Sequence, residues 1–203
     1  GAIVRFGLQG VDHLVRTDLE GPLDTGHLMG TLLRKVLSEG IFMRPKADVV
    51  GIDDGPADVT IRLKDDDELR AARVVICTNG YAQQLVPDIA VTPARGQVLM
   101  TAPLPGLKLK GTFHYQEGSY YFRDHAGGIL LGGGRNLDVA GETTMVEGTT
   151  PLIQDALENL LRTVIIPGQP YTIAQRWSGI MGMGPSKTPI IEHRSPRVIV
   201  AVR

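Results

Sequence analysis

Thr78, Asn79 and Gly80 follow a short apolar stretch, Val74–Ile76, and form the segment of this chain best suited to bind a ligand. A continuous run of β-branched residues is typical of a strand that is buried on both faces. The small polar residues after it would expose backbone at the carboxyl end of that strand, where open α/β sheets bind their ligands. An ordinary turn after a buried strand fits the same pattern, so the segment alone leaves both interpretations open.

Other segments with chemistry-bearing residues favour simpler interpretations. The glycines at 132–134 precede no helix pattern, which a dinucleotide-binding glycine turn requires. The acidic residues 65–68 lack the glycine and distal glutamate of a calcium loop, so we predict a solvated turn there. The scattered histidines do not have the spacing of a zinc site. They include His27, His114, His125 and His193.

Composition restricts the class of protein. The net charge of −1 provides no electrostatic footprint for nucleic acid or an anionic membrane. No apolar run approaches the roughly 20 residues that a membrane helix needs. Cys77 is the only cysteine, which excludes an internal disulfide, and we expect it to be a small buried side chain. The first residues carry no signal-peptide pattern, so we predict a cytoplasmic protein.

The first half of the chain has mixed α and β patterns that would position these residues. Apolar residues recur at helical spacing over residues 25–39, where Asp24 or Thr25 can cap the start and Gly40 suits the left-handed position past the end. Residues 49–52 read as a strand. Val59–Leu63 alternates like one arm of a hairpin whose return arm would be residues 69–76.

The second half is richer in strand patterns. We predict a strand at residues 96–102, bracketed by Pro93 and Pro105, and then a hairpin that turns at residues 125–128. A second helix begins at Pro151, with Thr150 as its cap. A strand at 171–177, a flexible run at 179–185 and an apolar strand at 198–203 follow. The fold class is therefore mixed α/β.

Seven segments, taken in order along nearly the whole chain, resemble one family. Each motif is weak by itself, and the order in which they occur carries the resemblance. They are Leu23-Asp24-Thr25-Gly26, residues 72–81, 93–97, 120–123 and 130–133, Trp177-Ser178-Gly179, and residues 188–191. In this order they are similar to the flavin-dependent D-amino-acid oxidase superfamily, which includes glycine oxidase, sarcosine oxidase and γ-glutamylputrescine oxidase.

The resemblance implies an interior part of a larger oxidoreductase. Family members begin with a strand and a Gly-x-Gly-x-x-Gly turn that place the FAD pyrophosphate on a helix N-terminus, and this sequence has no such motif. By resemblance, residues 21–92 and 176–203 belong to a βαβ-type FAD-binding domain. Residues 93–175 would form an antiparallel substrate domain, and residues 1–20 the end of its first segment. Without the pyrophosphate-binding element, we expect the chain alone to be inactive.

The resemblance also implies the positions that meet non-covalently bound FAD. The backbone around Val49 would meet the adenine side. The strand-end residues Thr78, Asn79 and Gly80 would lie near the cofactor, and Gly179, Ile180 and Met181 would approach the isoalloxazine ring. No cysteine corresponds to the one that holds flavin covalently in some relatives, because Cys77 lies in a predicted strand.

The implied chemistry is oxidation of a carbon–nitrogen bond of a small amine or amino acid by hydride transfer to the flavin. Tyr121 and Arg123 are the substrate-side candidates, because an arginine fork binds a carboxylate at two points. Alternatively, Tyr121 packs in the hairpin and Arg123 forms a surface pair. Two departures leave substrate and electron acceptor open. Met181 stands where amino-acid-oxidising relatives often have an arginine, and no lysine lies near Leu130, where sarcosine oxidases have one.

A second class of function stays open. The chain could be a non-catalytic binding module whose sheet edges pair with another chain. A strand and a Gly-x-Gly-x-x-Gly motif upstream of Gly1 would favour the oxidoreductase, whereas a monomer that begins at Gly1 would favour the module.

Overall fold

The computed structural model describes residues 2–203, which fold into two compact units. The first unit comprises residues 1–23 and 95–179, and the second comprises residues 24–94 and 180–203. Each unit therefore combines segments that are distant in sequence. Within the described residues, no helix is both long and apolar enough to cross a bilayer.

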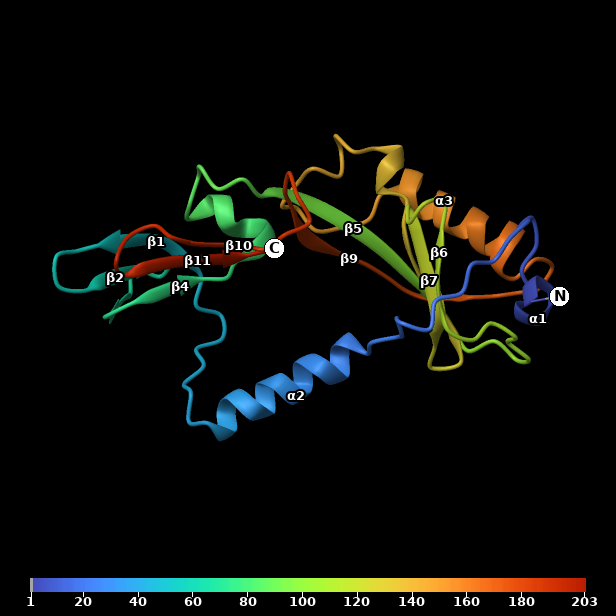
Figure 1. The fold of residues 1–203 in the computed structure, drawn as a ribbon, viewed down its shortest axis with the longest axis horizontal. Helices are drawn as coiled ribbons and strands as arrows, with labels where there is room; N and C mark the ends of the chain where they lie inside the picture. The colour runs from blue at the N-terminus through green and yellow to red at the C-terminus, as the bar shows by residue number, and fades with distance from the viewer. Residues whose placement is uncertain (1) are drawn as a thin grey trace. The chain divides into compact units, whose positions relative to one another are not determined.

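The first unit is a five-stranded antiparallel sheet with a helix against one face (Figure 1). The strand order is β6-β7-β8-β5-β9. Two of these strands, β5 and β9, continue into the second unit at one end. The elements are α1 (Ala2–Phe6), β5 (Thr92–Thr101), β6 (Thr112–Tyr115), β7 (Tyr120–His125), β8 (Gly128–Gly133), α3 (Pro151–Leu160) and β9 (Ile173–Met183).

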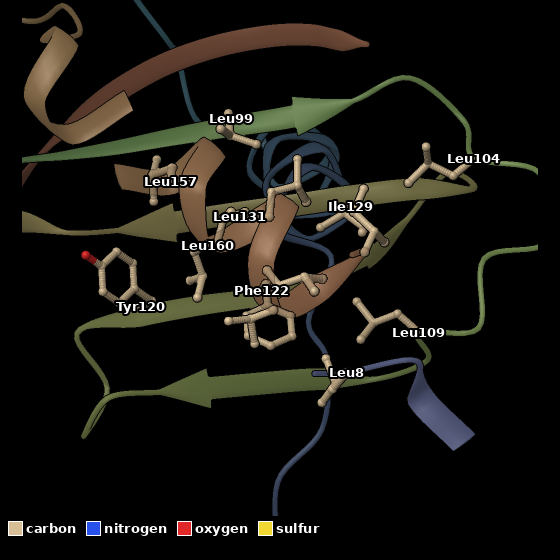
Figure 2. Packing of buried hydrophobic residues seen from close by; sticks show 14 of the residues in the cluster. Leu8, Leu99, Leu104, Leu109, Tyr120, Phe122, Ile129, Leu131, Leu157 and Leu160 are labelled. Carbon is tan, nitrogen blue, oxygen red and sulfur yellow. The ribbon is translucent and has the colours of Figure 1, made fainter. Parts of the chain in front are cut away.

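The core of the first unit lies between the sheet and α3. Leu157 and Ile153 on α3 are buried, as are Leu131 of β8 and Leu99 of β5. Figure 2 shows β7 and β8 contributing alternate side chains, Tyr120 with Phe122 and Ile129 with Leu131, to one apolar cluster. At the β7–β8 hairpin, Ala126 and Gly127 both have positive φ (+48° and +80°), as a two-residue hairpin turn requires. The predicted hairpin and second helix are thus confirmed.

The second unit contains two three-stranded sheets and one long helix. One sheet has the order β1-β2-β3 and is antiparallel, and the other has the order β10-β11-β4 with β4 parallel to β11. The elements are α2 (Thr25–Ser38), β1 (Val49–Asp54), β2 (Val59–Leu63), β3 (Glu68–Ala71), β4 (Val74–Ile76), β10 (Ile190–His193) and β11 (Val198–Val202).

A smaller apolar cluster holds the second unit together. Val59 of β2, Ile76 of β4 and Val200 of β11 are among its buried members. Helix α2 begins at the predicted residue and ends one residue before the predicted end, at Ser38. Asp24 caps it, since Asp24 Oδ1 accepts a hydrogen bond from the His27 N–H at 2.9 Å, and Gly40 has φ +73°. However, none of its residues is buried, so the apolar stripe of this helix stays exposed.

The prediction that residues 69–76 form the return arm of the hairpin with Val59–Leu63 is wrong for the second half of that segment. Only Glu68–Ala71 pairs with β2, whereas Val74–Ile76 leaves that sheet and pairs in parallel with β11. The expectation of a fully buried strand is also wrong, because β4 lies at the sheet edge of the described chain and Val75 is 55% exposed. Cys77, just past this edge strand, is exposed rather than buried.

Two further strand boundaries and one helix cap differ from the sequence prediction. β5 begins at Thr92, so Pro93 is the second residue of the strand. A residue without a backbone N–H is tolerated there because it lies at the strand end. The predicted flexible run at 179–185 is mostly strand, because β9 extends to Met183. Thr150 is the N-cap residue of α3, as predicted, but its side chain makes no capping hydrogen bond, and its hydroxyl accepts one from Gln97 Nε2 instead.

Candidate functional site

In the second unit, β4 and β11 run parallel, so their carboxyl ends lie at one edge of the sheet. Thr78 and Asn79 are exposed at this edge, and Gly80 is buried. Asn79 has a left-handed backbone conformation (φ +44°), and its Oδ1 accepts a hydrogen bond from the backbone N–H of Arg203 at 3.1 Å. The turn after β4 is therefore tied to the end of β11.

The end of β9 approaches this turn closely. A Cβ on Gly80 would lie 2.8 Å from the carbonyl oxygen of Met181 and 2.9 Å from Ile180 Cγ2. A Cβ on Gly182 would lie 2.3 Å from Asn79 Oδ1. Only glycine fits at both positions, and the structure thereby brings together two segments that were singled out from the sequence, residues 78–80 and residues 180–181.

The other two predicted cofactor positions lie elsewhere. Val49 is the first residue of β1 in the separate antiparallel sheet, where it pairs with Leu63. Gly179 belongs to the part of β9 assigned to the first unit, and a Cβ there would meet nothing within 4 Å. No close packing therefore requires a glycine at position 179.

A hollow of about 380 Å³ lies beside Asn79, at the strand-end edge, and Pro189, Ile191, Val202 and Arg203 also line it. Arg203 Nη1 is buried and has no acceptor among residues 2–203. A buried guanidinium N–H without a partner suits an anionic oxygen such as that of a phosphate. The lining of the hollow is largely apolar, and Arg203 is the one cationic residue among those that line it.

In the first unit, a second set of candidate residues lies on the face of the sheet that is turned away from α3. Tyr120 and Phe122 of β7 point into the core, so Tyr121, Arg123 and His125 lie on the other face by strand alternation. We call this surface the open face of the sheet. Arg176 of β9 contacts Gln154 and Glu158 of α3. Alternation along β9 then places Trp177, which is 38% exposed, on the open face as well.

Arg123 is held on the open face by two neutral acceptors. Its Nη1 donates to the carbonyl oxygen of Leu23 at 2.8 Å, and its Nη2 lies 3.1 Å from His125 Nδ1. Its Nε is buried and has no acceptor among residues 2–203. No ion pair among residues 2–203 includes Arg123. The guanidinium charge is therefore uncompensated, and the surface-pair alternative for Arg123 finds no acidic partner.

Tyr121 packs against a glycine on the neighbouring strand. It pairs with Gly132 of β8, and a Cβ on Gly132 would lie 2.5 Å from the Cζ and Oη atoms of Tyr121. Partial burial raises the pKa of Tyr121 above its ordinary value of 10, so the phenol keeps its proton at neutral pH and can donate a hydrogen bond. The residue packs in the hairpin and still presents a polar group on the open face.

Sequence reasoning missed His125 and Gly132. His125 was assigned to the hairpin turn, but it is the last residue of β7 and the turn consists of Ala126 and Gly127. The spacing of two between Tyr121, Arg123 and His125 was the available signal, since residues i, i+2 and i+4 of a strand share a face. The contact between Tyr121 and Gly132 depends on strand register, which no local pattern specified.

Comparisons with known proteins identify the family and the fold of this chain. A family model described as "FAD dependent oxidoreductase" (DAO) matches residues 5–203. A comparison with curated protein sequences gives no match. The chain is structurally similar to L-proline dehydrogenase from P. horikoshii (TM-score 0.70, 15% identity, 87% of this chain and 49% of that chain).

Two oxidases have similar structures. One is glycine oxidase from Geobacillus kaustophilus (TM-score 0.69, 19% identity, 86% of this chain and 47% of that chain). The other is fructosamine oxidase (Amadoriase II) from Aspergillus fumigatus (TM-score 0.66, 16% identity, 86% of this chain and 48% of that chain). The chain spans about half the length of these relatives. The predicted mixed α/β fold is confirmed, and the chain belongs to the DAO family of FAD-dependent oxidoreductases.

Proposed function

We propose that this chain is part of an oxidoreductase that oxidises the carbon–nitrogen bond of a small amine or amino acid, with non-covalently bound FAD. The observation that carries the proposal is Arg123, a guanidinium on the open face with no acidic partner among residues 2–203 and with a buried Nε that lacks an acceptor. A substrate carboxylate would compensate the charge and accept hydrogen bonds from the N–H groups of Nη1 and Nη2 that are still free.

In this proposal, FAD supplies the hydride acceptor when it is bound. Arg123 binds the substrate carboxylate and thereby fixes the orientation of the substrate. Tyr121 donates a hydrogen bond from its protonated phenol, because its raised pKa keeps the proton in place. An amine that arrives neutral needs no further proton transfer from the protein, so the residues of the open face act by binding and orientation.

The second unit would contact the cofactor. Thr78, Asn79 and Gly80 at the strand-end edge, with Ile180 and Met181, are the proposed contacts, and Val49 and Gly179 are two more that the family resemblance implies. We accordingly assign residues 21–92 and 176–203 to the FAD-binding domain and residues 93–175 to the substrate domain, with residues 1–20 as the end of its first segment. The compact units found in the structure have boundaries within a few residues of these.

Flavin titration tests the cofactor part of the proposal. We expect the purified chain to quench FAD fluorescence saturably and to perturb the flavin absorbance bands, and denaturation to release the flavin intact. Gly80→Ala should weaken binding about tenfold or more, because its Cβ would lie 2.8 Å from the Met181 carbonyl oxygen. The matched control is Gly30→Ala in α2, where a Cβ meets only Arg34 Nη1 at 3.7 Å. Absence of FAD binding by the unaltered chain would overturn the expectation that these 203 residues hold the cofactor without the rest of the protein. Equal binding by Gly80→Ala and Gly30→Ala would overturn the assignment of Gly80 to the cofactor contacts.

A non-catalytic binding module is the second candidate, and specific observations favour it. None of the residues of α2 is buried, and Met29 on its apolar stripe is 62% exposed. Val75 on the edge strand β4 is 55% exposed. Exposed apolar edges pair readily with other chains. Light scattering after size exclusion distinguishes the candidates: a stable oligomer without FAD binding would favour the module.

A further inference from the structure

Arg123 and His125 make a contact whose direction is determined by chemistry. Arg123 Nη2 lies 3.1 Å from His125 Nδ1. A guanidinium has only donors, so His125 Nδ1 must be the acceptor and cannot carry a proton. The imidazole is therefore neutral, with its N–H on Nε2. Both residues project from the same face of β7, two positions apart, so the contact needs no distant element to form it.

The contact leaves Arg123 free to bind an anion. Of the five N–H groups of a guanidinium, two are used, one by Leu23 O and one by His125 Nδ1, which leaves three, including the buried Nε. Asp124, the neighbouring acid, lies on the other face of the strand and accepts from Lys110 Nζ at 3.1 Å and from the Gly111 N–H at 2.8 Å. A neutral acceptor such as His125 can hold the guanidinium in place without compensating its charge.

We propose that His125 is a positioning residue: it holds the guanidinium of Arg123 in the orientation in which that group binds a substrate carboxylate. This inference rests on the proposed function of Arg123. A free arginine side chain samples many rotamers, and two-point binding of a carboxylate requires one orientation of the planar fork. The Leu23 carbonyl holds one Nη atom and His125 holds the other, so together they determine the plane of the guanidinium.

The experiment compares two substitutions of His125 by their effect on carboxylate binding. His125→Leu removes the acceptor, whereas His125→Asn keeps one, because the Asn Oδ1 takes a place similar to that of Nδ1. Acetate is the probe, and the readout is the Nε–Hε resonance of Arg123 in ¹⁵N-labelled protein, assigned with Arg123→Met. His114→Leu is the matched control, because His114 is exposed on the same face, opposite Tyr121, and makes no hydrogen bond to Arg123.

We expect acetate to shift the Arg123 resonance, His125→Leu to weaken acetate binding about tenfold, and His125→Asn and His114→Leu to leave it within about twofold. The imidazole ¹⁵N shifts of the unaltered chain should show a proton on Nε2 alone. If acetate shifts the Arg123 resonance and His125→Leu binds acetate as tightly as the unaltered chain does, the positioning role is refuted and the proposed function stands. If acetate does not shift the Arg123 resonance, the proposed carboxylate site and the positioning role both fail.

Discussion

Replacing Arg95 by methionine removes one partner of the most deeply buried ion pair of the first unit. Arg95 Nε and Nη2 donate to Glu142 Oε2 and Oε1 at 2.9 and 2.8 Å, and the two side chains are 11% and 1% exposed. Gln97 Nε2 also donates to Glu142, at 2.9 Å. The pair ties β5 to the segment before α3, so its loss should destabilise the unit that carries the open face.

The magnitude follows from burial. Removing one partner of a buried ion pair costs about 3–5 kcal/mol, because the remaining charge is left without compensation. After Arg95→Met, Glu142 keeps the hydrogen bond from Gln97, so we expect the lower end of that range, about 3 kcal/mol. The double variant Arg95→Met/Glu142→Leu leaves no buried charge and should recover part of the loss.

Urea denaturation followed by Trp177 fluorescence measures this loss, since Trp177 is the only tryptophan and lies in the first unit. Lys110→Met is the control. It removes the partner of Asp124 from a pair in which the lysine side chain is 68% exposed, and should cost less than about 1 kcal/mol. If Arg95→Met costs no more than Lys110→Met, or if the double variant is less stable than Arg95→Met, the reasoning from burial is refuted.

The remaining predictions concern pH and packing. The hydrogen bond from Arg95 lowers the pKa of Glu142 below its ordinary value of 4.5, despite the opposing effect of burial. The ionised Glu142 therefore stabilises the folded state above pH 4.5, and this contribution is lost as the pH falls through the lower pKa of the folded state. Glu142→Gln should therefore flatten the acid limb of stability against pH, and an unchanged slope would contradict this. Gly132→Ala should cost about 1–3 kcal/mol, because its Cβ would collide with Tyr121, whereas Gly179→Ala meets nothing within 4 Å and should cost less in the same urea assay. Leu157→Ala in α3 should lower the free energy of unfolding by about 2–5 kcal/mol, because Leu157 is fully buried. Leu32→Ala in α2 should change the thermal midpoint little, because Leu32 is 47% exposed. Equal shifts of the thermal midpoint for the two variants would contradict the argument from burial.

Local patterns were sufficient for most of the secondary structure. The helix at Thr25–Ser38 was predictable from apolar spacing and from Asp24 as its cap, and the β7–β8 hairpin from the glycines at its turn. These features depend on residues within about one turn of one another, so the sequence contains the whole signal. The order of the weak motifs also indicated the family that the comparison with family models bears out.

Long-range pairing was not predictable in the same way. Val74–Ile76 has the composition of a hairpin arm and of a parallel strand alike, and only its partner β11, more than 100 residues later, decides between them. The exposure of Val75 and Cys77 follows from that choice of partner and not from their residue types. The pattern of a strand indicates which of its residues share a face, but it does not indicate whether a neighbouring strand covers its edge.

The sequence by itself determined helices α2 and α3, the β7–β8 hairpin and the choice of Tyr121 and Arg123 as candidates, because residue type and local spacing carry that information. The order of its motifs also carried the resemblance to the family. Only the tertiary structure decided that Arg123 lies without an acidic partner among residues 2–203, that His125 accepts its hydrogen bond, and that Gly80 meets Met181. These facts depend on strand register and on contacts between distant segments. Both are set by the packing of the whole unit, so no local pattern in the sequence encodes them.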